Sequence, residues 1–125
     1  MNWINQTVAE FGLSIGIPTL ALDEKLSLRL QMQDNSSIFI SHLPNLAIPE
    51  VLVGRSITMQ YKTTETLRAA LKSADFRTPT QWPLQVAAND KELIFVMRIT
   101  ERAFVLNVLE KALVYLTELS RKINA

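Results

Sequence analysis

The chain has 125 residues, of which 48% are hydrophobic, so it is long and apolar enough to form one domain with its own core. Thirteen basic and twelve acidic residues leave a formal charge of +1, which gives no field that would indicate a nucleic-acid partner. The absence of cysteine excludes disulfides, thiolate zinc sites and cysteine nucleophiles. No apolar run approaches the roughly 18–20 residues of a membrane span, and the N-terminus lacks the basic start of a secretory signal. We expect a single cytoplasmic domain over residues 1–125.

Residues 2–15 are predicted to form an amphipathic helix. The apolar side chains recur at three- and four-residue steps and make one stripe, formed by Trp3, Ile4, Val8, Phe11 and Ile15. Gly12 is expected to weaken the helix locally. Gly16 and Pro18 then end it, because glycine suits the left-handed cap and proline cannot continue a helix.

Three strands are predicted to follow. Residues 26–33 alternate leucine or methionine with polar residues, which indicates a strand with one buried face. Asp34, Asn35 and Ser36 have turn chemistry, and the segment 38–40 returns as the second strand of a hairpin. The stretch 43–50 contains two prolines and is expected to be irregular or a sheet edge. A third strand is expected over 51–61, with one face formed by Ile57, Met59 and Tyr61.

A short helix and two further strands are predicted after the third strand. Thr63 or Thr64 can cap a short helix over 65–74, whose inward residues are predicted to be Leu67, Ala70, Leu71 and Ala74. After a loop over 75–83, residues 84–88 and 93–99 form a second hairpin. The run from Leu93 to Met97 is continuously apolar, which indicates a strand buried on both faces.

A long helix is predicted from Thr100, as its cap, to about Ile123. Its apolar stripe consists of Val105, Val108, Leu109, Ala112, Leu113, Leu116, Leu119 and Ile123. Glu101 near the start and the Arg121-Lys122 pair near the end suit the helix dipole. About 22 residues would make a helix of roughly 33 Å. The predicted fold class is therefore α+β, in the order helix, three strands, helix, two strands, helix.

Residues that could carry catalysis are sparse. The single histidine, His42, is read as an exposed loop residue, and no second histidine supports a metal site. Asp23, Glu24 and Glu92 are read as solvated carboxylates beside strands. Arg98 and Arg102 are read as surface charges. The sequence has no glycine-rich phosphate loop, so we expect a protein that is not an enzyme and has no catalytic residue, metal or cofactor.

Several helices and strands carry more apolar residues than one buried face would need. These additional apolar residues indicate a surface for a partner. The first helix carries more than one narrow stripe. Residues near the proline breaks could form a sheet edge that accepts an added strand, namely Ile48, Val51, Leu52 and Val53. Four residues lie off the main stripe of the last helix, namely Phe104, Leu106, Val114 and Tyr115. The same residues could instead complete the core, and the pattern does not separate the two roles.

An ordered set of short motifs extends over nearly the whole chain. It begins with Met1-x-Trp3-Ile4, Phe11 and Ile17-Pro18-Thr19. It continues with Gly54-Arg55-Ser56-Ile57 leading into Leu67-Arg68-Ala69-Ala70-Leu71. Trp82-Pro83-Leu84, Leu93-Ile94-Phe95-Val96 and Glu101-Arg102 complete it. In these motifs and in element order the chain resembles the SycN-like class I type III secretion chaperones, which have the CesT/SycE-like fold.

The resemblance implies a partner chaperone and a cargo, and no cofactor or ATP. SycN-like proteins pair with a small YscB-like chaperone, and the heterodimer binds the N-terminal region of a YopN-like gatekeeper in extended form. The resemblance implies a cargo groove formed by Trp3, Val8, Phe11, Ile15, Leu28, Leu30, Ile38 and Ile40. It implies a dimer contact formed by Ile57, Met59, Leu67 and Leu71. These chaperones are commonly acidic, and this chain departs from that at +1.

Two alternative functions remain open from the sequence. The first is a homodimeric class I chaperone for a secreted effector, which has the same fold. The second is an α+β ligand-binding domain that is not a chaperone, which would need a deep pocket lined by convergent polar groups. In either of the chaperone readings the protein is expected in the bacterial cytoplasm, with a peripheral association at the secretion apparatus as one option.

Overall fold

The computed structural model describes residues 3–58, 64–74, 81–89 and 91–123, and its elements follow the predicted order. They are α1 (Trp3–Ser14), β1 (Ser27–Gln31), β2 (Ser37–Leu43), β3 (Glu50–Thr58), α2 (Thr64–Ser73), β4 (Leu84–Ala88), β5 (Glu92–Thr100) and α3 (Leu106–Ile123). A short 3₁₀ turn, η1 (Glu101–Ala103), precedes α3. The predicted α+β class is confirmed.

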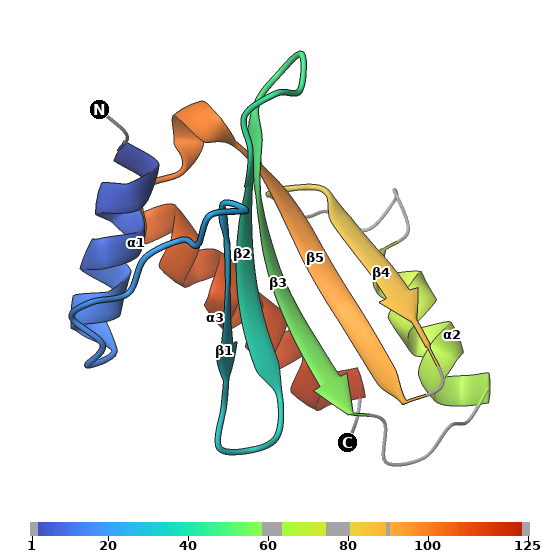
Figure 1. Cartoon of the computed structure of the whole chain (residues 1–125). Helices are drawn as coiled ribbons and strands as arrows, with labels where there is room; N and C mark the ends of the chain where they lie inside the picture. The colour runs from blue at the N-terminus through green and yellow to red at the C-terminus, as the bar shows by residue number, and fades with distance from the viewer. Residues whose placement is uncertain (1–2, 59–63, 75–80, 90, 124–125) are drawn as a thin grey trace.

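The five strands form one antiparallel sheet in the order β1-β2-β3-β5-β4. The two hairpins lie at the two ends of the sheet, and β3 joins them by pairing with both β2 and β5. In Figure 1, α3 crosses behind the sheet, α1 lies beside the β1 end, and α2 lies beside the β4 end. The helices therefore cover one face of the sheet and leave the other open.

The core lies between the sheet and the helices on its covered face. Alternate residues of β5 point into it and are almost completely buried, namely Leu93, Phe95, Met97 and Ile99. Val51 and Val53 of β3 are fully buried beside them, and α3 contributes Leu109 and Leu116. Each such side chain contributes about 1.5–3 kcal/mol relative to an exposed position. The apolar residues that recur every second position in β5 and at helical spacing in α3 thus pack into the same core.

The first helix buries the expected stripe in part. Ile4, Val8 and Phe11 are buried, whereas Trp3 is exposed and Ile15 lies beyond the end of α1. Gly12 has a packing role, because a β-carbon there would lie 2.4 Å from the Ile17 carbonyl oxygen and close to Leu20. The segment after the helix folds back against this glycine, and Gly16 has the left-handed conformation expected of a cap, with φ +82°.

The prediction that β5 is buried on both faces is wrong for this chain. Burial alternates along the strand, and Ile94 and Val96 are only half-buried. These two side chains lie on the open face of the sheet, where the ring of Phe39 contacts Gly54 on the adjacent strand. An uninterrupted apolar run does not reveal that a single layer of helices covers only one of its faces.

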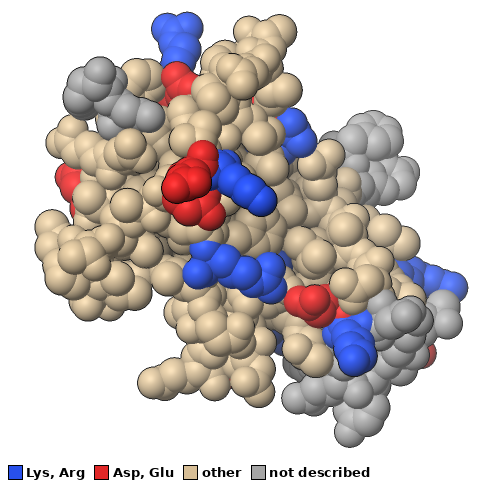
Figure 2. Space-filling view, in the orientation of Figure 1, with Lys and Arg blue, Asp and Glu red and all other residues tan. Residues whose placement is uncertain are grey.

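Charges on the open face are mixed in sign. Figure 2 shows basic and acidic side chains next to one another across the middle of this face. Arg98 donates to Glu50 with an Nη2–Oε1 distance of 2.5 Å, which confirms the reading of Arg98 as a strand-surface charge. Arg29 and Glu92 form a second ion pair at 3.7 Å. Because opposite charges are paired here, this face has no large region of one sign.

The last helix begins later than the sequence predicts. Thr100 belongs to β5 and makes no side-chain capping bond, and Glu101 belongs to the 3₁₀ turn. The helix α3 starts at Leu106, so Val105 lies before it and the helix has 18 residues, or about 27 Å. Phe104, which was expected off the stripe and open to a partner, is fully buried. The backbone turns at residues 101–105 so that this ring enters the core.

Two further predictions about exposed and buried residues are wrong. The segment around Val51, Leu52 and Val53 is not a sheet edge, because β3 lies between β2 and β5. Ile48 is highly exposed in the connection before β3. On α2, Leu71 was expected to point inward and is 65% exposed, while Ala70 is buried. Met59, Tyr61 and Thr63 lie outside the described residues.

Candidate functional site

An apolar groove opens between the β1–β2 hairpin, α1 and α3. Its volume is about 340 Å³, and its walls come from four elements and the turn after β1. The apolar lining consists of Phe11, Met32, Ile38, Leu113 and Val114, and the remaining lining residues are Arg55, Thr117, Glu118 and Arg121. Ile38 of β2 and Arg55 of β3 point inward, so part of the inner face of the sheet belongs to the lining of the groove.

Exposed apolar side chains lie at this groove. Val114 on α3 is 57% exposed and Met32 in the hairpin is 39% exposed, although each could have been polar without cost to the core. A single exposed apolar side chain is ordinary, whereas a group that shares one concave surface indicates a binding site. Leu13 and Ile15 add exposed apolar surface at the end of α1.

The free edge of β1 offers backbone hydrogen-bonding groups beside the groove. The His42 N–H donates to Leu26 O and the Met32 N–H donates to Ser36 O, each at 2.8 Å, so the even-numbered residues of β1 bond to β2. Arg29 and Gln31 therefore direct their N–H and C=O groups outward. In the described part of the chain no strand pairs with this edge. An extended peptide could add there as a further strand.

The residues implied as cargo contacts divide into four groups. Trp3 and Ile15 are exposed, at 39% and 42%. Leu28 and Leu30 are half-buried on the inner side of β1, while Phe11 and Ile38 are 5% exposed and line the groove floor. Val8 and Ile40 are fully buried in the core. The groove thus brings together Phe11 and Ile38 from this set, and Val8 and Ile40 offer no surface to a ligand in this conformation.

The residues implied as dimer contacts also differ in exposure. Ile57 is buried on β3, Leu67 is half-buried on α2, and Leu71 is exposed on the same helix. Met59 lies outside the described residues. Of the described three, Leu71 is the one whose side chain is open to a second chain.

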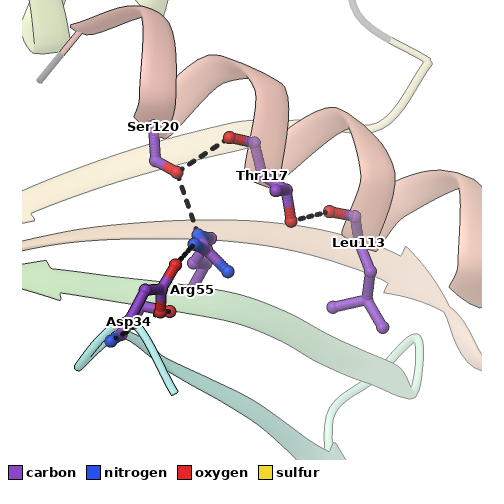
Figure 3. A network of polar contacts seen from close by, with 6 residues as sticks. Asp34, Arg55, Leu113, Thr117 and Ser120 are labelled. Carbon is purple, nitrogen blue, oxygen red and sulfur yellow. Dashed lines mark hydrogen bonds and ion pairs between the residues drawn. The ribbon is translucent and has the colours of Figure 1, made fainter. Parts of the chain in front are cut away.

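A buried arginine, which the sequence analysis did not select, connects three elements at one end of the groove. Arg55 of β3 is 5% exposed; its Nε donates to Ser120 Oγ on α3 at 2.9 Å, and its Nη2 donates to Asp34 Oδ2 at 3.2 Å (Figure 3). Ser120 in turn donates to the Thr117 carbonyl oxygen. A buried charge is tolerated when it is paired and hydrogen-bonded, as here. Its signal in the sequence is the alternation in β3, which places Arg55 on the same inward face as Val53 and Ile57.

The Asp34 carboxylate should make stability depend on pH. The hydrogen bond from the Ser36 hydroxyl, followed by that from the Ser36 N–H and by the Arg55 charge, holds the pKa of Asp34 below its ordinary value of 3.8. A lowered pKa in the folded state means that the ionised carboxylate stabilises the fold above pH 3.8 and that this contribution is lost as the pH falls through the lowered pKa. Asp34→Asn should therefore cost stability near neutral pH and little in strong acid. Urea unfolding across the acid range tests this, and an equal cost at all pH values would contradict it.

The single histidine is not the exposed loop residue that the sequence predicts. His42 lies in β2 with 7% exposure, and its Nε2 is 2.6 Å from Glu101 Oε2. Its Nδ1 has no hydrogen-bond partner. The contact joins β2 to the turn before α3. Glu101 therefore pairs with His42 and does not lie in the first turn of α3, where it was expected to interact with the helix dipole. The two residues are 59 positions apart, so no local pattern reveals the pair.

The described residues contain no group of three or more histidine, aspartate and glutamate side chains placed to hold a metal ion. No helix in the described ranges is long and apolar enough to cross a membrane.

Comparison with solved structures identifies the fold. A chain of the ExsC–ExsE complex matches with a TM-score of 0.77 and 18% identity, over 94% of this chain and 90% of that one. A chain from the complex of the Yersinia pestis type III secretion chaperone SycH with a stable fragment of YscM2 matches at 0.72 and 11%, over 96% and 98%. A chain of the HopA1–SchA chaperone–effector complex matches at 0.71 and 12%, over 95% and 91%.

Neither a protein-family model nor a curated protein sequence matches the chain. The structural matches extend over almost the full length of both partners, and the three helices and five-stranded sheet correspond throughout. At 18% identity or less they establish the fold. The chain has the α+β fold of the type III secretion chaperones.

Proposed function

We propose that this protein is a type III secretion chaperone that holds a segment of a secreted protein in extended form. The observation that carries the proposal is the apolar groove beside the free edge of β1, on a fold shared with chaperones solved together with their partners. A groove lined by Phe11, Met32 and Val114 has no evident use in the isolated chain. The protein would act by binding and not by catalysis, in the bacterial cytoplasm.

The binding mode follows from the geometry of the groove. The main chain of the cargo would pair with the outward groups of Arg29 and Gln31, and alternate side chains would fill the apolar groove. Ordering a disordered segment costs conformational entropy, so affinity requires a large buried apolar area. The exposed residues Leu13 and Ile15 would extend that area beyond the groove. A segment held in this way cannot fold or aggregate before secretion.

The resemblance to SycN-like proteins supports a YopN-like gatekeeper as cargo and a YscB-like chaperone as partner. The exposed Leu71 supports a second chain at α2, because an apolar side chain that is 65% exposed gains by being covered. The alternative is a homodimeric class I chaperone for an effector, which the match to a chaperone–effector complex favours equally. The mass of the chain purified alone separates the two, since a stable homodimer supports the alternative.

Val114→Lys tests the groove without damaging the core. Val114 is 57% exposed, and the glutamates one turn away on each side, Glu110 and Glu118, can accept the added charge, so the helix should remain folded. We expect binding of the N-terminal region of the YopN-like gatekeeper to weaken by about tenfold or more, as about 1.4 kcal/mol of apolar contact is lost. Isothermal titration calorimetry measures this.

The matched control is Ile48→Lys, which makes the same change at an exposed position in the β2–β3 connection, at the opposite end of β2 from the hairpin turn. It should leave binding unchanged. Equal affinity of the Val114→Lys variant and the parent chain would rule out the groove as the cargo site. If the gatekeeper does not bind while an effector of the same secretion system does, the alternative cargo is correct.

A further inference from the structure

A second, polar cavity adjoins the apolar groove and shares two arginines with it. Its volume is about 510 Å³, and it is lined by Asp34, Asn35, Ser36, Arg55, Ile57, Thr58, Ser120 and Arg121. Arg55 and Arg121 line both spaces, so the two form one continuous surface that changes from apolar to polar along α3. A ligand that occupies both needs an apolar part and a polar part in sequence.

The guanidinium of Arg55 is fixed in place and retains a free donor. Ser120 and Asp34 accept from Nε and Nη2, and Nη1 makes no hydrogen bond among the described residues (Figure 3). Nη1 is not among the buried polar atoms that lack a partner, so it is accessible to solvent. The side chain is only 5% exposed as a whole, so a ligand would meet an oriented donor whose ordering cost has already been met by folding.

The charges at the polar cavity favour an anion. Among the described residues that line this cavity, Arg55 and Arg121 face a single acid, Asp34, whose carboxylate is already occupied by Ser36 and Arg55. The Arg121 side chain has no ion pair or hydrogen bond within the described ranges. Glu118 lies in the apolar groove, one turn before Arg121, and does not line the polar cavity. The described lining of the polar cavity therefore carries one more positive charge than negative charges.

We infer that the segment held in the groove carries an aspartate or glutamate close to a large apolar residue, and that its carboxylate binds between Arg55 and Arg121. Arginine binds carboxylates through directed, charge-assisted hydrogen bonds, which are stronger than those between neutral groups. The inference rests on the proposed function and adds a sequence requirement for the cargo. The apolar contact supplies affinity, and the carboxylate fixes the register of the extended segment.

A set of short acetylated peptides tests this with the intact protein. Each peptide contains leucine residues in an extended, alternating pattern, followed one to four positions later by glutamate, glutamine or lysine. At the best spacing we expect the glutamate peptide to bind about tenfold more tightly than the glutamine peptide, and the lysine peptide to bind more weakly than both. Only the glutamate peptide should shift the NMR signal of the Arg55 Nε–H group.

Two variants test whether the carboxylate of the peptide binds at Arg121. Arg121→Gln should abolish the preference for glutamate, whereas Lys122→Gln removes the same charge from a neighbour that lines neither cavity and should preserve the preference. Arg55 is left intact because it links three elements of the fold. Equal affinity for glutamate and glutamine peptides, or a preference that survives Arg121→Gln, would overturn the inference and leave the proposed function standing. If no peptide binds at any spacing, the groove itself, and with it the proposed function, is contradicted.

Discussion

Replacing Phe11 with alanine is expected to lower the free energy of unfolding by about 3–5 kcal/mol. The ring is 5% exposed, lies in the core cluster, and forms the floor of the groove with Ile38 and Leu113. Such a loss is a large fraction of the 5–15 kcal/mol that stabilises a typical domain. Urea unfolding followed by tryptophan fluorescence or circular dichroism measures it.

The matched comparison is Ile15→Ala, four residues further along the chain. Ile15 is 42% exposed and lies beyond the end of α1, so its removal should change the unfolding free energy by no more than about 0.5 kcal/mol. Equal losses at Phe11 and Ile15 would contradict the assignment of Phe11 to the core. The comparison also guides binding experiments. A charged residue in place of Phe11 would unfold the chain, so a loss of binding by that variant would not show that Phe11 contacts the cargo.

The difference between these two residues shows what the sequence could predict. Both belong to the same helical stripe, and the stripe correctly identifies α1 and its buried side. The pattern does not show that α1 ends at Ser14 or that Gly12 receives the returning chain at Ile17. Those facts depend on packing against residues outside the helix, so core and groove remained indistinguishable within one stripe.

Local periodicity predicts where the strands lie in the sequence, but it does not predict which strands pair with one another outside the two hairpins. The alternation in β1 and β4 and the turn at Asn35 follow from residues close in sequence, and both hairpins formed as expected. The order β3-β5, which makes β3 central, depends on pairing between segments some forty residues apart. The contacts of His42 with Glu101 and of Arg55 with Ser120 extend over 59 and 65 residues. A single sequence contains no periodic signal at such separations.

The polar end of the groove was missed for the same reason. The motif Gly54-Arg55-Ser56-Ile57 does not by itself indicate burial, although the place of Arg55 in the alternation between Val53 and Ile57 indicates an inward charge that needs a partner. No local pattern selects that partner, since Asp34 lies in a predicted turn and Ser120 is one of several residues of α3 that carry a hydroxyl group. The fold brings the three together, and this determines where the groove becomes polar.

Phe104→Ala is expected to destabilise the protein by about 3–5 kcal/mol, although the sequence pattern alone favours a place for this residue in a partner surface. Its side chain is fully buried, and it is among the largest completely buried side chains of the described chain. Its carbonyl oxygen accepts a hydrogen bond from the Thr7 hydroxyl of α1 at 3.4 Å, so the turn before α3 is also joined to the first helix. Loss of the ring should therefore loosen α1 as well as the turn.

Val114→Ala provides the contrast, because Val114 was interpreted in the same way and is 57% exposed. Its removal should change stability by no more than about 0.5 kcal/mol. Hydrogen exchange should show faster exchange in α1 for the Phe104→Ala variant and unchanged protection there for Val114→Ala. A small loss at Phe104 with undisturbed α1 amides would mean that the turn is not anchored by this ring. The expected result instead makes Phe104 a core residue that helps to hold the turn before α3 against α1.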